Sequence, residues 1–176
     1  MNQTLISHTK EGAEHTLDLV NSWINAVDTK ASYALSLTSI LTGFIMIQGV
    51  PQAFSSLCNA QAITFQILIN AALVFLLYLS SYIAISLLVS AIMARVKSTS
   101  GITSHLFFGH IANSDLRQFS QEFITLTEEQ YTNELLEQIH TNSSICMKKC
   151  TYYQCGIYAL LIAITLCFIC CLLQLI

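Results

Sequence analysis

The residues best placed to do chemistry lie around Asp28, where a polar N-terminal segment meets the first long apolar stretch. On a helix, the polar side chains of this region fall on two stripes. One stripe holds Asn21, Asn25, Asp28 and Ser32, and the other holds Trp23, Lys30 and Tyr33. Trp, Tyr and Lys at a membrane boundary commonly act as simple anchors. A carboxylate there gains little unless a cation or a donor faces it, and Lys30 points elsewhere on the helix, so Asp28 argues against simple anchoring.

Thiols and imidazoles offer a second kind of chemistry. Cys146 and Cys150 are one helical turn apart, with His140 nearby in the sequence. A zinc site needs paired, convergent ligands that water can reach, and the cysteines at 167, 170 and 171 lie in an apolar stretch where small apolar packing is the better interpretation. We predict no metal site, no catalytic set of Ser, His and Asp residues, and therefore no enzyme. A metal or redox role at Cys146 and Cys150 is the alternative.

These candidate residues belong to a chain with the composition of a membrane protein. Its 176 residues are 54% hydrophobic and 10% charged, whereas a soluble domain carries about 25% charged residues. The formal net charge of -3 provides no basic field for a nucleic acid polymer, which argues against that class of partner. We therefore expect an all-α integral membrane protein built as a helical bundle.

Three apolar stretches without Asp, Glu, Lys, Arg or His are each long enough for the roughly 20 residues that cross a bilayer. They are residues 31–49, 65–94 and 156–176, which predict three transmembrane helices. All seven basic residues precede the first span or lie between the second and the third. The positive-inside rule then places residues 1–30 and 95–155 in the cytoplasm and the 50–64 loop outside.

The two cytoplasmic segments are predicted to be helical and continuous with the spans. Apolar or small residues recur at alternating spacings of 4 and 3, typical of a heptad seam, at Ala13, Leu17, Val20, Ile24, Val27, Ala31, Ala34 and Thr38. A capping box at Thr127–Gln130 starts a second helix, whose packing face leads toward the third span through Tyr131, Leu135, Ile139, Asn142, Cys146 and Cys150. Between these helices we expect a turn at residues 97–101 and a shorter helix around Leu106–Phe123.

Three sequence blocks resemble the signatures of a known family. The first is Asn25–Ser32, the second is Leu106–Ala112, and the third is Leu135–His140 followed by Ser143, Ile145, Lys148 and Lys149. In this order, with apolar spans in the matching places, they look like the Pycsar transmembrane effectors over roughly residues 15–170. That family's final Lys is commonly followed by an aromatic residue, whereas Cys150 follows here, so both lysines stay candidates for that position.

The resemblance implies an effector of bacterial anti-phage defence in the cell inner membrane. In such a system a partner pyrimidine cyclase makes cyclic CMP or cyclic UMP on infection. The effector responds to the nucleotide by impairing the membrane, which causes abortive infection. No cofactor besides this ligand is implied.

The cytoplasmic part is too small and too helical for a separate β-barrel nucleotide-binding domain. We therefore expect a composite pocket between helices or between protomers, with a cation for the cyclic phosphate, an aromatic surface for the base and polar groups for its edge. The candidates for the phosphate are Lys30, Arg95, Lys148 and Lys149; those for stacking are Trp23, Phe107 and Phe108; those for the base edge are Asn25, Asp28, Gln138 and His110.

Small residues four apart in the first span favour close helix association and a homo-oligomer, namely Ser32 with Ser36 and Ser39 with Gly43. Two other functions stay open. A holin-like toxin would damage the membrane without a ligand. A membrane anchor would recruit a soluble partner protein through residues 100–150.

Overall fold

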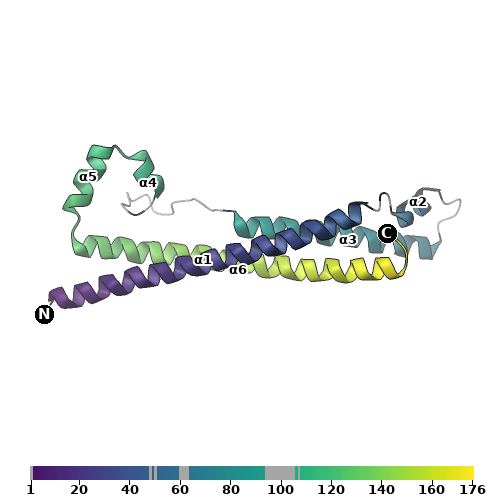
Figure 1. Cartoon of the computed structure of the whole chain (residues 1–176), viewed down its shortest axis with the longest axis horizontal. Helices are drawn as coiled ribbons and strands as arrows, with labels where there is room; N and C mark the ends of the chain where they lie inside the picture. The colour runs from purple at the N-terminus through teal and green to yellow at the C-terminus, as the bar shows by residue number, and fades with distance from the viewer. Residues whose placement is uncertain (1, 48, 50, 60–63, 94–105, 107) are drawn as a thin grey trace. The chain divides into compact units, whose positions relative to one another are not determined.

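The computed structural model describes residues 2–47, 49, 51–59, 64–93, 106 and 108–176 (Figure 1). In these ranges the helices are α1 (Asn2–Ile47), α2 (Gln52–Asn59), α3 (Phe65–Ile92), α4 (Phe108–Asn113), α5 (Leu116–Thr125) and α6 (Glu128–Leu172). They contain no strand, so the all-α prediction is confirmed for the described part of the chain. The chain divides into two compact units, one of residues 27–93 and 149–176 and the other of residues 1–26 and 94–148. We call them the bundle unit and the seam unit.

Among the described residues, three helices are long and apolar enough to cross a membrane, the number that the sequence predicts. They are α3 and the much longer α1 and α6, in which a predicted span is continuous with a predicted cytoplasmic helix. Their bounds differ slightly from the sequence-based ones, because α1 ends at Ile47 and α6 at Leu172. Gly49 has a φ of 78°, a left-handed conformation that glycine adopts without steric cost and that terminates the first span.

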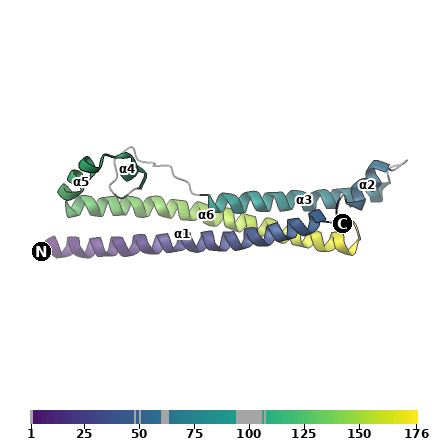
Figure 2. The same ribbon diagram turned by 45° about the horizontal axis from the view of Figure 1, so that its top comes forward.

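In the bundle unit, α1, α3 and α6 lie side by side around an apolar core (Figures 1 and 2). The larger cluster of buried residues takes side chains from all three helices and from α2: Ile45, Ala53, Val74, Leu77, Ala163, Cys167, Cys170 and Leu175. A smaller cluster of Ala84, Ala159 and Leu160 packs α3 against α6. Near it, a Cβ built on Gly156 would lie 2.9 Å from Leu88 Cγ, so only glycine permits this close approach.

The last residues of the chain fold back onto this core. The amide of Leu175 donates to the carbonyl of Cys170 at 2.9 Å, and that of Gln174 donates to Cys171 at 3.1 Å. Gln174 has a φ of 53°. This is the Schellman arrangement, in which one left-handed residue satisfies the free carbonyls of a helix end and an apolar residue packs behind it. Leu175 is that apolar residue, and it is buried in the larger cluster.

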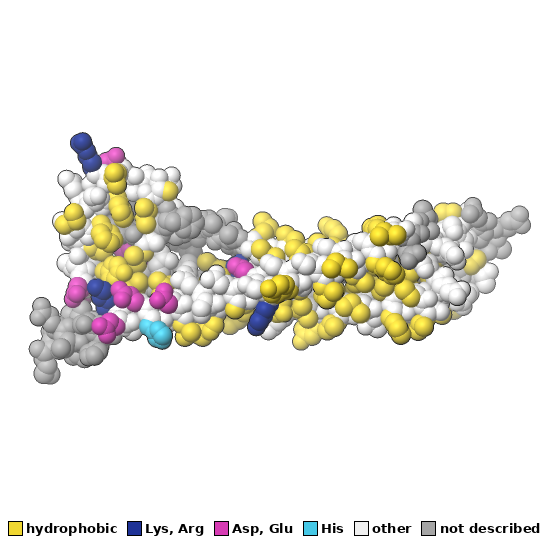
Figure 3. Space-filling view, in the orientation of Figure 1, with side chains coloured by type: hydrophobic (Ala, Val, Ile, Leu, Met, Phe, Trp, Pro, Cys, Tyr) yellow, Lys and Arg dark blue, Asp and Glu magenta, His cyan; other side chains and the backbone are white. Residues whose placement is uncertain are grey.

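The outer surface of the bundle unit is apolar as well. Figure 3 shows hydrophobic side chains spread over the face in view, and large residues such as Ile40, Phe75 and Phe168 are 58–70% exposed. Buried hydroxyls, in contrast, are satisfied within their own helices, as in Thr38, which donates to the Ala34 carbonyl at 2.7 Å. An apolar exterior around internally satisfied polar groups is what a lipid environment requires.

The seam unit is built on the N-terminal parts of α1 and α6. On α1 the predicted heptad seam is confirmed, because its residues are buried except Leu17 and Ile24, which are half-buried. The seam residues from Val27 onward belong to the bundle unit. The second packing face is confirmed too, with Leu135 and Cys146 buried and its other members half-buried. The capping box also forms. The backbone N–H of Gln130 donates to Thr127 Oγ1 at 3.3 Å, and the backbone N–H of Thr127 donates to Gln130 Oε1 at 2.9 Å.

The connecting segment of this unit differs from its prediction. Instead of one helix around Leu106–Phe123, the structure has α4 and α5, separated at Ser114 and Asp115. The physical reason is that Asp115 caps a new helix, because its carboxylate accepts a hydrogen bond from the Arg117 amide at 3.2 Å. The predicted turn at residues 97–101 lies outside the described residues.

Candidate functional site

The bundle unit buries a charged side chain, that of Lys149 on α6. Among the residues that the structure describes, it is the sole buried ionisable one with a charge at neutral pH, and the residue as a whole is 6% exposed. Its ammonium lies 2.5 Å from Asp28 Oδ1 on α1 and donates to the Ile92 carbonyl on α3 at 3.2 Å. One cation therefore contacts all three spanning helices.

Each contact of Lys149 has a local cause. Ile92 is the last residue of α3, where carbonyls lack partners within the helix and carry the negative end of the helix dipole, so a cation is favoured there. Asp28 is the carboxylate for which the sequence supplied no cation. Lys30, the nearest lysine in the sequence, is exposed. The cation that faces Asp28 is therefore Lys149, a residue from a distant part of the chain.

The same helix pairing is seen in the seam unit. Asn142 Nδ2 donates to Asn21 Oδ1 at 2.9 Å, and the Lys10 ammonium lies 5.2 Å from the centre of the Tyr131 ring. Burial and the neighbouring Glu14 raise the pKa of Tyr131. Each of these pairs joins residues 121 positions apart, as do Asp28 and Lys149. A constant difference in residue number between paired residues is what two parallel helices, here α1 and α6, produce.

The other candidate residues are divided between the two units. Trp23, Asn25, Gln138 and Lys148 belong to the seam unit, and Lys30 belongs to the bundle unit with Asp28 and Lys149. Trp23, Asn25, Lys30 and Lys148 are exposed, and Gln138 is half-buried. Phe108 and His110 are in α4, with side chains outside the description, and Arg95 and Phe107 lie outside the described residues altogether.

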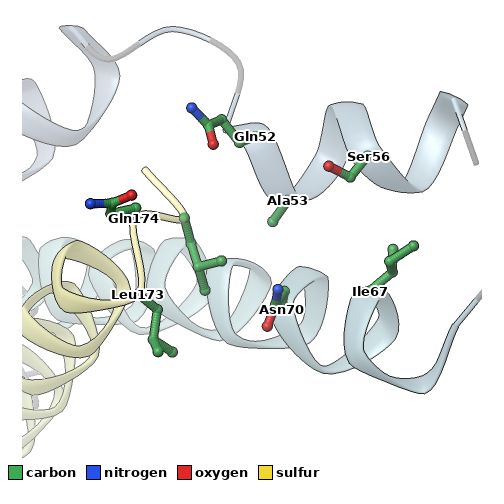
Figure 4. Close-up of a pocket in the computed structure, with 8 residues that line it drawn as sticks. Gln52, Ala53, Ser56, Ile67, Asn70, Leu173 and Gln174 are labelled. Atoms are coloured by element: carbon green, nitrogen blue, oxygen red, sulfur yellow. The ribbon is translucent and has the colours of Figure 1, made fainter.

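A hollow in the bundle unit was not anticipated from the sequence. It has a volume of about 290 Å³ and lies between α2, the start of α3 and the last residues of the chain. Figure 4 shows Ala53 on α2 and Asn70 on α3 on opposite sides of it. Asn70 Oδ1 accepts a hydrogen bond from Gln66 Nε2 at 3.0 Å. The hollow contains no charged residue, and it is far along the spans from Lys149.

The cysteines form neither a disulfide nor a metal cluster in the structure. None of the seven takes part in a disulfide, and no group of three or more His, Cys, Asp or Glu residues gathers among the described residues in a way that would hold a metal ion. Cys146 is buried and Cys150 half-buried along the packing face of α6. Their place is that of packing residues.

Three helices that are long and apolar enough to cross a membrane, linked by one largely buried ion pair, define the class of this molecule, a helical membrane protein. Comparison with known proteins gives the family. Residues 12–176 match the family model described as the Pycsar effector protein domain, PycTM. The chain is also 30% identical, over 179 aligned residues, to the Pycsar effector protein GmPycTM of Gulbenkiania mobilis, covering 93% of this chain and 91% of that protein.

The chain therefore belongs to the Pycsar effector family, and it is an effector of anti-phage defence. This confirms the family suggested by the three sequence blocks. No solved structure matches the chain.

Proposed function

We propose that this effector binds cyclic CMP or cyclic UMP in the cytoplasm and then impairs the bacterial inner membrane. A partner pyrimidine cyclase supplies the nucleotide on infection, and the damage ends the infection by killing the cell. Membership of the family supports the defence role. The observation that carries the coupling is that α1 and α6 each run uninterrupted from a predicted cytoplasmic segment into a span. A ligand that tilts or shifts such helices also moves their buried parts.

Exposed cations are the better candidates for the first contact with the cyclic phosphate. Lys30 and Lys148 are exposed, whereas Lys149 is buried and already bound to Asp28. Trp23, at 53% exposure, offers a free ring face for stacking on the base. A nearly complete switch requires about 5.5 kcal/mol of differential binding, which a pocket shared by several helices or protomers reaches by summing modest contacts.

Two features support the proposed arrangement in the membrane, the distribution of basic residues along the chain and the exposed small residues of the first span. The positive-inside rule places the N-terminus and residues 95–155 in the cytoplasm. A homo-oligomer is supported by the small residues of the first span, since Ser32, Ser36, Ser39 and Gly43 are all exposed on a single chain and thus accessible to a second copy.

Thermal unfolding of the detergent-purified protein tests nucleotide binding. We expect cyclic CMP or cyclic UMP to raise the melting temperature and cyclic AMP and cyclic GMP to leave it unchanged, since a ligand at 100 times its Kd stabilises the folded state by about 2.7 kcal/mol. Lys30→Met and Lys148→Met should weaken the shift. Arg117→Met, which removes an exposed cation from α5, is the matched control.

A melting temperature that none of the four nucleotides changes would contradict the proposal. Killing of cells that lack the cyclase would point instead to a holin-like toxin. Capture of a soluble protein by residues 100–150 without depolarisation would point to a membrane anchor.

A further inference from the structure

The Asp28–Lys149 ion pair differs from the other polar contacts inside the bundle unit. Buried hydroxyls there are satisfied by carbonyls of their own helix, as Ser81 is by Leu77 at 2.9 Å. Lys149 instead takes both of its partners from other helices, the carboxylate of Asp28 on α1 and the carbonyl of Ile92 on α3. Its contacts therefore exist only while the three helices hold this one arrangement.

The two partners are not equally fixed. The Ile92 carbonyl is part of the backbone at the end of α3 and stays with that helix. The Asp28 side chain is 34% exposed, so water can reach the carboxylate and replace the ammonium as its partner. Lys149 has no such alternative, because its side chain is 8% exposed. Of the two contacts of Lys149, the one with Asp28 is therefore the easier to break.

A buried ion pair of this kind contributes little net stability. The cost of removing both charges from water nearly cancels their attraction, whereas the loss of one partner leaves the other buried and uncompensated. The pair is therefore better suited to select one arrangement of helices than to hold the fold together. Stability of the bundle comes from its two apolar clusters, neither of which includes Asp28 or Lys149.

We infer that the Asp28–Lys149 ion pair is an autoinhibitory contact that keeps the spans in their membrane-sealing arrangement, and that its release is the step by which the effector is switched on. This inference rests on the proposed function and names its regulation. The phosphate of the proposed nucleotide and the Asp28 carboxylate are both anions whose oxygens accept hydrogen bonds from an ammonium group. Competition for Lys149 would therefore release α1.

The test is dye release from vesicles of phosphatidylethanolamine and phosphatidylglycerol, without any nucleotide. Asp28→Asn keeps the shape of the side chain and removes its charge, and Lys149→Gln removes the cation. We expect both variants to release dye about tenfold faster than the wild type, since loss of a charge-assisted hydrogen bond shifts an equilibrium by about that factor or more.

Two controls accompany these variants. Asp18→Asn makes the same chemical change at an exposed position of α1 and should stay sealed. Arg117→Gln removes an exposed cation from α5 and should also stay sealed. Only variants that elute from size exclusion as the wild type does are scored.

Sealed vesicles with correctly eluting Asp28→Asn and Lys149→Gln would overturn the inference. So would a failure of both variants to assemble, since the pair would then be needed for the fold itself. The proposed function fails separately, if wild-type protein ignores every nucleotide while the charge-removing variants still leak.

Discussion

The bundle unit and the seam unit bury their side chains in different ways. In the bundle unit, three long helices and α2 surround one cluster, and residues such as Val74 and Leu77 are 0% exposed. In the seam unit, burial follows a narrow line between α1 and α6, and α5 buries no residue at all. A cluster enclosed by several helices resists local rearrangement. A seam between two helices is open to solvent on its sides, so a ligand can rearrange it at a lower cost in free energy.

Two fully buried leucines test this difference most strongly. Leu77 lies in the bundle cluster, and Leu135, at 2% exposure, lies on the seam. We expect Leu77→Ala to lower the free energy of unfolding by about 2–5 kcal/mol and Leu135→Ala to lower it by less than about 2 kcal/mol, because an open seam collapses around the lost volume. Unfolding in mixed detergent micelles measures both values. An equal or larger loss for Leu135→Ala would remove the distinction between the two units.

Close helix packing inside the bundle unit gives the next effect in size. Gly156→Leu should lower the free energy of unfolding by about 1–3 kcal/mol, because the new side chain meets Leu88, which is itself fully buried. Gly12→Leu is the matched control, since nothing lies within 4 Å of a Cβ at Gly12. If both variants unfold like the wild type, α3 and α6 are not packed as described.

The smallest expected effect is a pH dependence in the seam unit. Burial and the carboxylate of Glu14 raise the pKa of Tyr131 above its ordinary value of 10.0. The unfolded chain therefore releases this proton first as the pH rises, and the contribution of Tyr131 to stability is present below pH 10.0 and lost as the pH passes through the raised value.

Tyr131→Phe keeps the ring that faces Lys10 and removes the ionisable group. The difference in melting temperature between wild type and variant should therefore shrink as the pH is raised above 10.0. A constant difference across that range would show that Glu14 and burial do not act on Tyr131 as described.

Much of this fold could be predicted from the sequence because it depends on local patterns. The spans follow from runs without charge, the seam of α1 from heptad spacing, and the start of α6 from the Thr127–Gln130 capping box. The interruption of the helix at Asp115 was not predicted, because the sequence pattern does not distinguish a helix-capping Asp from an exposed Asp within a helix.

The partner of Asp28 could not be predicted in the same way. Periodicity identifies the face of a helix but not the register between two helices far apart in the sequence. A signal was nevertheless present, since Asn21 and Asp28 are one heptad apart, as are Asn142 and Lys149. The ligand-contacting residues stay a prediction, because their arrangement depends on residues from both units and on segments outside the described ones.

We propose that a cyclic pyrimidine nucleotide makes this protein breach a membrane. Dye release from vesicles that contain the wild-type protein is the most direct test, with each of the four cyclic nucleotides added in turn. We expect rapid release with cyclic CMP or cyclic UMP and intact vesicles with cyclic AMP or cyclic GMP. Vesicles that stay intact with both pyrimidine nucleotides, or that leak equally without any nucleotide, would contradict it.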